Sequence, residues 1–98
     1  EEYLQILQEN LHGILAAQKP DFVFYLAGVD ILETDKLGKL KVTLEGCKER
    51  DRLVLSTLAS LRLPCVIAMG GGYSEDVKII TEAHCNTFRQ AKELYKLD

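Results

Sequence analysis

Residues 22–30 read FVFYLAGVD and residues 65–73 read CVIAMGGGY, and these two stretches decide the fold. Each starts with a short run of apolar, β-branched and aromatic residues and ends in glycine. Such a run is typical of a strand that is buried on both faces of a parallel sheet. We therefore predict strands over 22–27 and 65–69, each followed by an irregular segment.

Apolar residues at helical spacing flank both strands. They recur from Glu2 to Gln18, where Pro20 marks the end of a first helix. Thr43 is the predicted N-cap of a second helix, and Ser74 that of a third with acidic residues in its first turn. The predicted fold is α/β, in the order helix, strand, helix, strand, helix. The side chains expected to face the core are Leu44, Cys47, Val54, Leu58 and Leu61 in the second helix and Val77, Ile80, His84, Phe88, Ala91 and Tyr95 in the third. The charged residues of the second helix are expected mostly to face water; they are Lys48, Glu49, Arg50 and Arg52.

The length of 98 residues allows one small domain, and nothing in residues 1–98 indicates an internal boundary. A two-stranded parallel sheet leaves both edges open, however, and strands that are apolar on both faces need neighbours. We expect the chain to be part of a larger doubly wound sheet. That sheet is completed either by self-association through the open edges or by the rest of a longer protein, and a first residue other than Met favours the longer protein.

Composition excludes several classes of function. The net charge is -3 and no block of basic residues occurs, which argues against a nucleic-acid partner. No apolar run is long enough for a membrane span, and the acidic start is unlike a signal peptide. The 3 cysteines are odd in number, widely spaced and set among apolar neighbours, as expected of buried, reduced thiols in a cytoplasmic protein.

The candidate chemistry lies after the two strands. Ligands of open α/β sheets bind at the carboxyl ends of the strands. If the strands are adjacent and parallel, Asp30 and Tyr73 lie on the same rim, although 43 positions separate them in the sequence. Asp30 is either a metal ligand or an ordinary turn residue.

The glycines at 70–72 also have two interpretations. They are either a tight turn that requires positive φ or a loop whose amides bind an anion. A dinucleotide fingerprint is incomplete, because its third glycine position falls on Glu75. We predict His84 to be a core histidine with a hydrogen-bond partner, and His12 to lie at the surface or between packed helices. A structural zinc site is not expected, since no Cys-x-x-Cys pair occurs.

Four motifs taken together carry a family resemblance. They are AGVD at 27–30, DKLG at 35–38, LEG at 44–46 and GGGY at 70–73. In order and spacing they resemble the C-terminal part of histone deacetylase family proteins, and most closely the bacterial members similar to class IV. The resemblance covers about residues 20–91. It implies the arginase/deacetylase fold, a three-layer α/β/α sandwich with a parallel sheet, in which residues 1–98 form the C-terminal portion of a single domain.

The resemblance also implies roles for five residues. Family members hold a catalytic Zn²⁺ with two aspartates and a histidine, and Asp30 matches the last of these ligands. Tyr73 matches the tyrosine whose hydroxyl stabilises the tetrahedral intermediate. Gly71, Gly72 and Leu37 match residues of the substrate channel. The implied substrate of the full-length parent is N-acetyl-lysine or a related acetylated amine.

The chain departs from the family pattern in two respects. The adjacent pair of histidines that acts as general acid and base, and the Asp-x-His segment that supplies the other metal ligands, are both absent from these 98 residues. We therefore predict that the chain alone is catalytically inactive. The alternative hypothesis is a non-enzymatic α/β module that binds a small anion at Gly70–Gly72.

Overall fold

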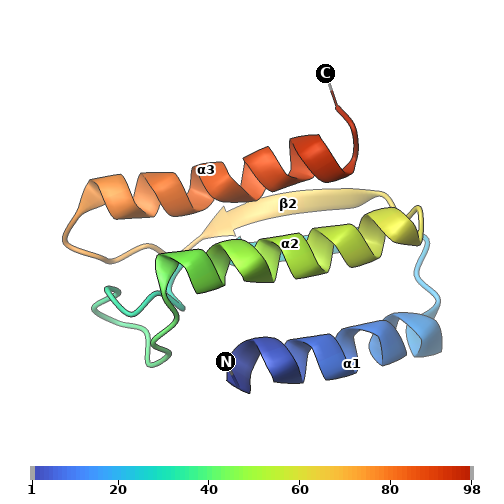
Figure 1. Cartoon of the computed structure of the whole chain (residues 1–98), viewed down its shortest axis with the longest axis horizontal. Coiled ribbons are helices and arrows are strands. Elements are labelled where there is room, and N and C mark those ends of the chain that lie inside the picture. Colours follow the sequence, from blue (N-terminus) through green and yellow to red (C-terminus); the bar gives the residue numbers. More distant parts are fainter. Residues whose placement is uncertain (1, 98) are drawn as a thin grey trace.

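The computed structural model describes residues 2–97 and confirms the predicted order of elements (Figure 1). The elements are α1 (Glu2–Gln18), β1 (Val23–Gly28), α2 (Leu44–Ser60), β2 (Cys65–Gly70) and α3 (Val77–Leu94). The two strands pair in parallel, so the α/β class is confirmed. Among residues 2–97, no helix combines the length and the apolar character that crossing a membrane requires.

The two faces of the sheet differ in exposure. On the face toward α2, Ala27 is buried and the hydroxyl of Tyr25 donates a hydrogen bond to Asp51 at 2.6 Å. Phe24 and Leu26 point to the opposite face, where they are 70% and 77% exposed. Within residues 2–97, the sheet is therefore open on the face that carries Phe24 and Leu26.

The core lies under the loop that follows β1. Three of its five fully packed residues belong to that loop, and the other two come from α2 and α3; they are Val29, Leu32, Val42, Cys47 and Ala83. α1 lies beside α2, on the side away from α3 (Figure 1), and contributes no buried residue. The core thus fixes the loop after β1 against the two helices.

The predicted cap of α2 is confirmed, whereas the predicted cap of α3 is wrong. The hydroxyl of Thr43 accepts a hydrogen bond from the Gly46 N–H at 2.9 Å. α3 begins only at Val77, where the carboxylate of Asp76 accepts from the Lys78 N–H at 2.9 Å. Ser74 is buried and its hydroxyl lies 2.6 Å from that of Thr34, so it cannot cap the helix. The acidic residues before Val77 therefore precede the helix instead of forming its first turn.

The helix faces also differ in part from the prediction. The buried residues of α3 are Ala83, Asn86 and Thr87, whereas Val77 and Phe88 are 70% and 45% exposed. Small side chains on one face allow α3 to pack closely on α2, which turns the larger apolar residues outward. On α2, Arg50 is buried, although it was predicted to face water. Leu61, which was predicted to face the core, lies at the C-cap of α2 and is 42% exposed.

The predictions for the histidines and cysteines have mixed outcomes. His12 is exposed, which confirms the surface position. His84 is half-buried, and among residues 2–97 its buried Nδ1 has no hydrogen-bond partner, so the predicted partner is missing. Cys47 is buried, Cys65 and Cys85 are half-buried, and all are free thiols.

Candidate functional site

The site lies at the rim where both strands end. β1 and β2 pair in register from Val23 with Cys65 to Gly28 with Gly70, so the two following loops leave the sheet at the same edge. An isolated antiparallel bridge between Asp35 and Ser74 joins these loops. The predicted juxtaposition of the Asp30 and Tyr73 loops is therefore confirmed.

Glycine is required at both positions between β2 and Tyr73. Gly71 and Gly72 have φ values of +67° and +106°, which residues other than glycine rarely adopt. A Cβ atom at Gly71 would lie 3.0 Å from Cβ of Asp30. A Cβ atom at Gly72 would lie 2.9 Å from Cγ2 of Ile80. The turn interpretation is thus confirmed for these two glycines, and the missing side chain of Gly71 allows Asp30 to lie against the second loop.

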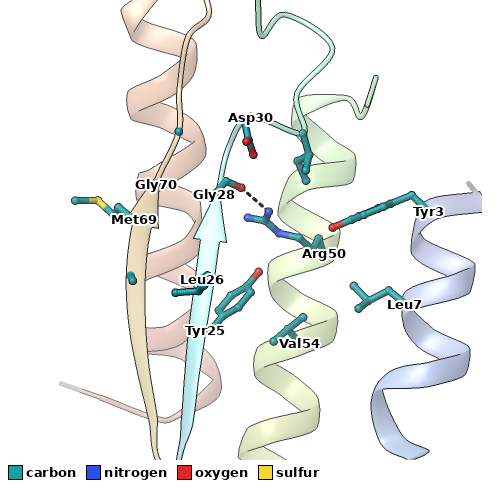
Figure 2. Close-up of a pocket in the computed structure, with 13 residues that line it drawn as sticks. Tyr3, Leu7, Tyr25, Leu26, Gly28, Asp30, Arg50, Val54, Met69 and Gly70 are labelled. Atoms are coloured by element: carbon teal, nitrogen blue, oxygen red, sulfur yellow. Dashed lines mark hydrogen bonds between the residues drawn. The ribbon is translucent and has the colours of Figure 1, made fainter. Parts of the chain in front are cut away.

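Asp30 borders an open hollow of about 490 Å³ at this end of the sheet. Figure 2 shows Asp30 just beyond the end of β1, with Gly28, Arg50 and Tyr3 nearby. Asp30 is exposed, so its carboxylate is accessible to a ligand. Leu37, on the loop after β1, is 70% exposed, and Tyr73, on the loop after β2, is 52% exposed. Neither residue lines the hollow.

Asp35 connects the two loops, although its residue type and position in the sequence predict no functional role. One carboxylate oxygen accepts from the Tyr73 N–H at 2.7 Å, and the other accepts from the Leu37 N–H at 3.0 Å and the Gly38 N–H at 2.7 Å. The hydrogen bond from Tyr73 is the main cause that lowers the pKa of Asp35; burial opposes it, and the other two bonds add to it. Asp35 is therefore ionised at neutral pH. The Asp-x-x-Gly turn at 35–38 is the sequence signal that could have identified it.

A second missed feature is a buried polar network under the rim. Asp51 is fully buried and accepts hydrogen bonds from Tyr25, from the Arg50 guanidinium at 2.9 Å and from the Thr87 hydroxyl at 2.6 Å. Arg50 also donates to the carbonyl of Gly28 at 2.5 Å (Figure 2). The network therefore links α2 and α3 to the end of β1, two residues before Asp30.

The pKa values in this network favour the charged arginine and the neutral phenol. Burial raises the pKa of Tyr25 well above its usual value. Burial alone would lower the pKa of Arg50, but the neighbouring Tyr25 and Asp51 raise it overall. The network thus contains a buried ion pair between Arg50 and Asp51.

Replacing Asp51 by Ala is expected to lower the free energy of unfolding by about 3–5 kcal/mol, because it leaves a buried guanidinium without its partner. Urea unfolding followed by circular dichroism measures this change. The matched control is Glu49→Gln on the same helix, which removes only an exposed pair with Arg52 and should cost about 0–1 kcal/mol. A loss no larger for Asp51→Ala than for the control would contradict the role given to the network.

The described residues can supply part of a zinc site but not all of its ligands. Between residues 2 and 97, no three side chains of the metal-binding types lie close enough together to hold an ion. His12 is on α1 and His84 on α3, while Asp30 stands at the rim. Asp30 offers the hard carboxylate oxygen that zinc accepts, and further ligands would have to come from outside these residues.

Comparison with known proteins identifies the family. The family described as histone deacetylase domain matches residues 1–89. An uncharacterized protein of Picosynechococcus is 43% identical over 93 residues, which are 95% of this chain and 31% of that protein. Histone deacetylase 2 of Arabidopsis thaliana is 35% identical over 92% of this chain and 24% of its own length. Histone deacetylase B of Dictyostelium discoideum is 31% identical over 74% of this chain and 16% of its own length.

The chain thus spans less than a third of each of these relatives. The match nevertheless includes both strands, the two rim loops and most of α3. The chain belongs to the histone deacetylase family.

Proposed function

We propose that this chain forms the C-terminal portion of a zinc-dependent deacetylase domain that hydrolyses N-acetyl-lysine or a related acetylated amine. In this proposal Asp30 is one zinc ligand and Tyr73 stabilises the transition state. The observation that carries it is the parallel, in-register pairing of β1 and β2, which brings the Asp30 and Tyr73 loops to one rim. Family membership supports the reaction class.

Each residue has a defined part in the proposed mechanism. A zinc ion, when bound, supplies polarisation of the amide carbonyl and a lowered pKa of water. The carboxylate of Asp30 helps to hold the ion. The hydroxyl of Tyr73 donates a hydrogen bond to the oxygen of the acyl group as negative charge develops there. Gly71 and Gly72 allow the backbone to approach the substrate, and Leu37 forms a wall of the channel for the acyl-lysine side chain.

The open face of the sheet supports a larger domain. Phe24 and Leu26 are largely exposed there, and Val66 on the neighbouring strand is 43% exposed. Burial of these side chains is favourable by about 25 cal/mol for each Å² of apolar surface. We propose that the rest of the deacetylase domain covers this face and supplies the paired histidines and the remaining zinc ligands.

The alternative function, anion binding at Gly70–Gly72, has less support. The amides of this loop lie next to Asp30, whose negative charge opposes an anion. α3 begins five residues after Gly72, at Val77, so the helix N-terminus is separated from the glycines. The deacetylase function is the better supported of the two.

The proposal predicts that residues 1–98 alone neither retain zinc nor deacetylate a peptide, since a single carboxylate cannot hold a catalytic metal. The complete domain, meaning the polypeptide that also carries the histidine pair and the Asp-x-His segment, should do both. Zinc content after dialysis and acetate release from an acetyl-lysine peptide are measured for each, with the chelated complete domain as control. Robust metal-dependent turnover by residues 1–98 alone, or none by the complete domain, would contradict the proposal.

A further inference from the structure

We propose that Asp35 is a positioning residue that fixes Tyr73 for catalysis through the Tyr73 backbone. This inference rests on the proposed function and deepens it, because it names the group that holds the tyrosine in place. Asp35 is not itself a catalytic residue or a proposed metal ligand. Its effect on the reaction is transmitted through Tyr73.

The first observation is that the two carboxylate oxygens of Asp35 accept hydrogen bonds from different loops. Oδ1 accepts from the N–H of Tyr73, which lies 38 positions further along the chain. Oδ2 accepts from the N–H groups of Leu37 and Gly38 in its own turn. Asp35 is 8% exposed, so water competes little for these bonds. One side chain therefore connects the loop that carries the proposed catalytic tyrosine to the loop that carries Asp30 and Leu37.

The second observation is that the Tyr73 side chain is only partly held. Tyr73 is 52% exposed, and within residues 2–97 its hydroxyl makes no hydrogen bond. Its backbone, in contrast, is held on both sides. The N–H donates to Asp35, and the carbonyl accepts from the Lys36 N–H at 3.3 Å. The position of the hydroxyl thus depends on the backbone contacts that Asp35 organises.

The third observation concerns the turn that Asp35 closes. A Cβ atom at Gly38 would lie 1.9 Å from the carbonyl oxygen of Asp30, so the turn packs directly on the backbone of the proposed ligand. The same atom would lie 3.2 Å from Oδ2 of Asp35. Asp35 therefore sets the spacing between the Asp30 backbone and the Tyr73 backbone.

The charge of Asp35 is needed as well as its shape. Three N–H groups point at its two oxygens. An asparagine at this position keeps one acceptor oxygen but places an NH₂ donor against at least one N–H group. Asp35→Asn is nearly isosteric, and in either orientation of its amide it breaks one side of the connection between the two loops. Hydrogen bonds to a charged group are also stronger than those to a neutral one.

The test is a double-mutant cycle in the complete domain, with Asp35→Asn, Tyr73→Phe and the double variant. With the Tyr73 hydroxyl present, Asp35→Asn should lower kcat by roughly 10- to 100-fold, since a misplacement of about 1 Å has effects of that order. In the Tyr73→Phe background it should change kcat by about twofold or less, because both residues act through the same hydroxyl. Zinc content and KM should stay unchanged. Glu33→Gln, an exposed carboxylate of the same loop, is the matched control and should leave kcat unchanged.

Three outcomes would overturn the inference. An unchanged kcat for Asp35→Asn, or an equal loss in both backgrounds, would show that Asp35 does not act through Tyr73. An unchanged kcat for Tyr73→Phe alone would contradict the proposed function, and the inference with it. If Asp35→Asn abolished cooperative unfolding, Thr34→Val would replace it in the cycle, because it removes only the hydroxyl contact to Ser74 beside the same bridge. A loss of kcat that does not depend on Tyr73 would again overturn the inference.

Discussion

Replacing Tyr73 by Phe in the complete domain is expected to lower kcat by about 100- to 1000-fold, the usual effect of removing one donor to a developing oxyanion. The ring stays in place and only the hydroxyl is lost. The loss should appear in kcat and in kcat/KM alike, because the hydrogen bond strengthens only as negative charge develops. Steady-state release of acetate from an acetyl-lysine peptide measures it, with zinc content determined on the same preparation.

The control for Tyr73→Phe is Tyr95→Phe at the C-terminal end of α3. The Tyr95 hydroxyl donates to the carbonyl of Leu63 at 2.8 Å, away from the rim. Tyr95→Phe is expected to cost about 1 kcal/mol of stability and to leave kcat unchanged. A Tyr73→Phe variant with the same kcat as the control would show that the Tyr73 hydroxyl has no catalytic role.

Replacing Asp30 by Ala should remove the metal and reduce turnover to background. Changes to groups that only support a ligand already reduce metal affinity by about 10- to 100-fold, so the loss of a ligand itself should have a larger effect. The zinc-to-protein ratio after dialysis and the acetate release are the two measurements. Both should fall together.

Glu33→Gln is the control for Asp30→Ala, because Glu33 is an exposed carboxylate of the same loop. The control should retain zinc and activity. Excess zinc in the assay should restore part of the activity of Asp30→Ala if the ion is bound more weakly but still correctly. Full zinc content and full activity of Asp30→Ala would rule out Asp30 as a ligand.

The sequence was sufficient to predict the elements whose signals are local. The helix ending before Pro20, the Thr43 cap and both strands depend on spacing and on side chains a few residues apart, and the structure confirms them. The start of α3 could not be predicted in this way. Ser74 is a good cap by type, but its hydroxyl is engaged by Thr34, which lies 40 positions earlier. Asp76 caps the helix in its place.

Arg50 shows a similar limit for burial. A run of charged residues on a helix usually marks a solvated face, and the prediction followed that pattern. Arg50 is buried because Asp51 and the carbonyl of Gly28 satisfy its guanidinium. The carbonyl of Gly28 and the hydroxyl of Tyr25, which supports Asp51, both lie more than 20 positions before Arg50 in the sequence, so local pattern could not predict these contacts.

For the site, the sequence located the rim but not its connections. The positions of Asp30 and Tyr73 follow from parallel pairing alone, which apolar runs and terminal glycines predict. Asp35 escaped notice because its essential donor is the backbone N–H of Tyr73, and every residue except proline carries such a group. Side-chain type therefore carries no information about that contact.

The most direct test of the proposed function is the position of zinc in crystals of the complete domain, located by anomalous scattering at the zinc edge. If Asp30 is a zinc ligand, a single strong peak is expected at about 2.0–2.2 Å from one of its carboxylate oxygens, on the rim that also carries Tyr73. A zinc peak away from Asp30, or none in protein that deacetylates the peptide, would contradict the assignment of this chain's part in the active site.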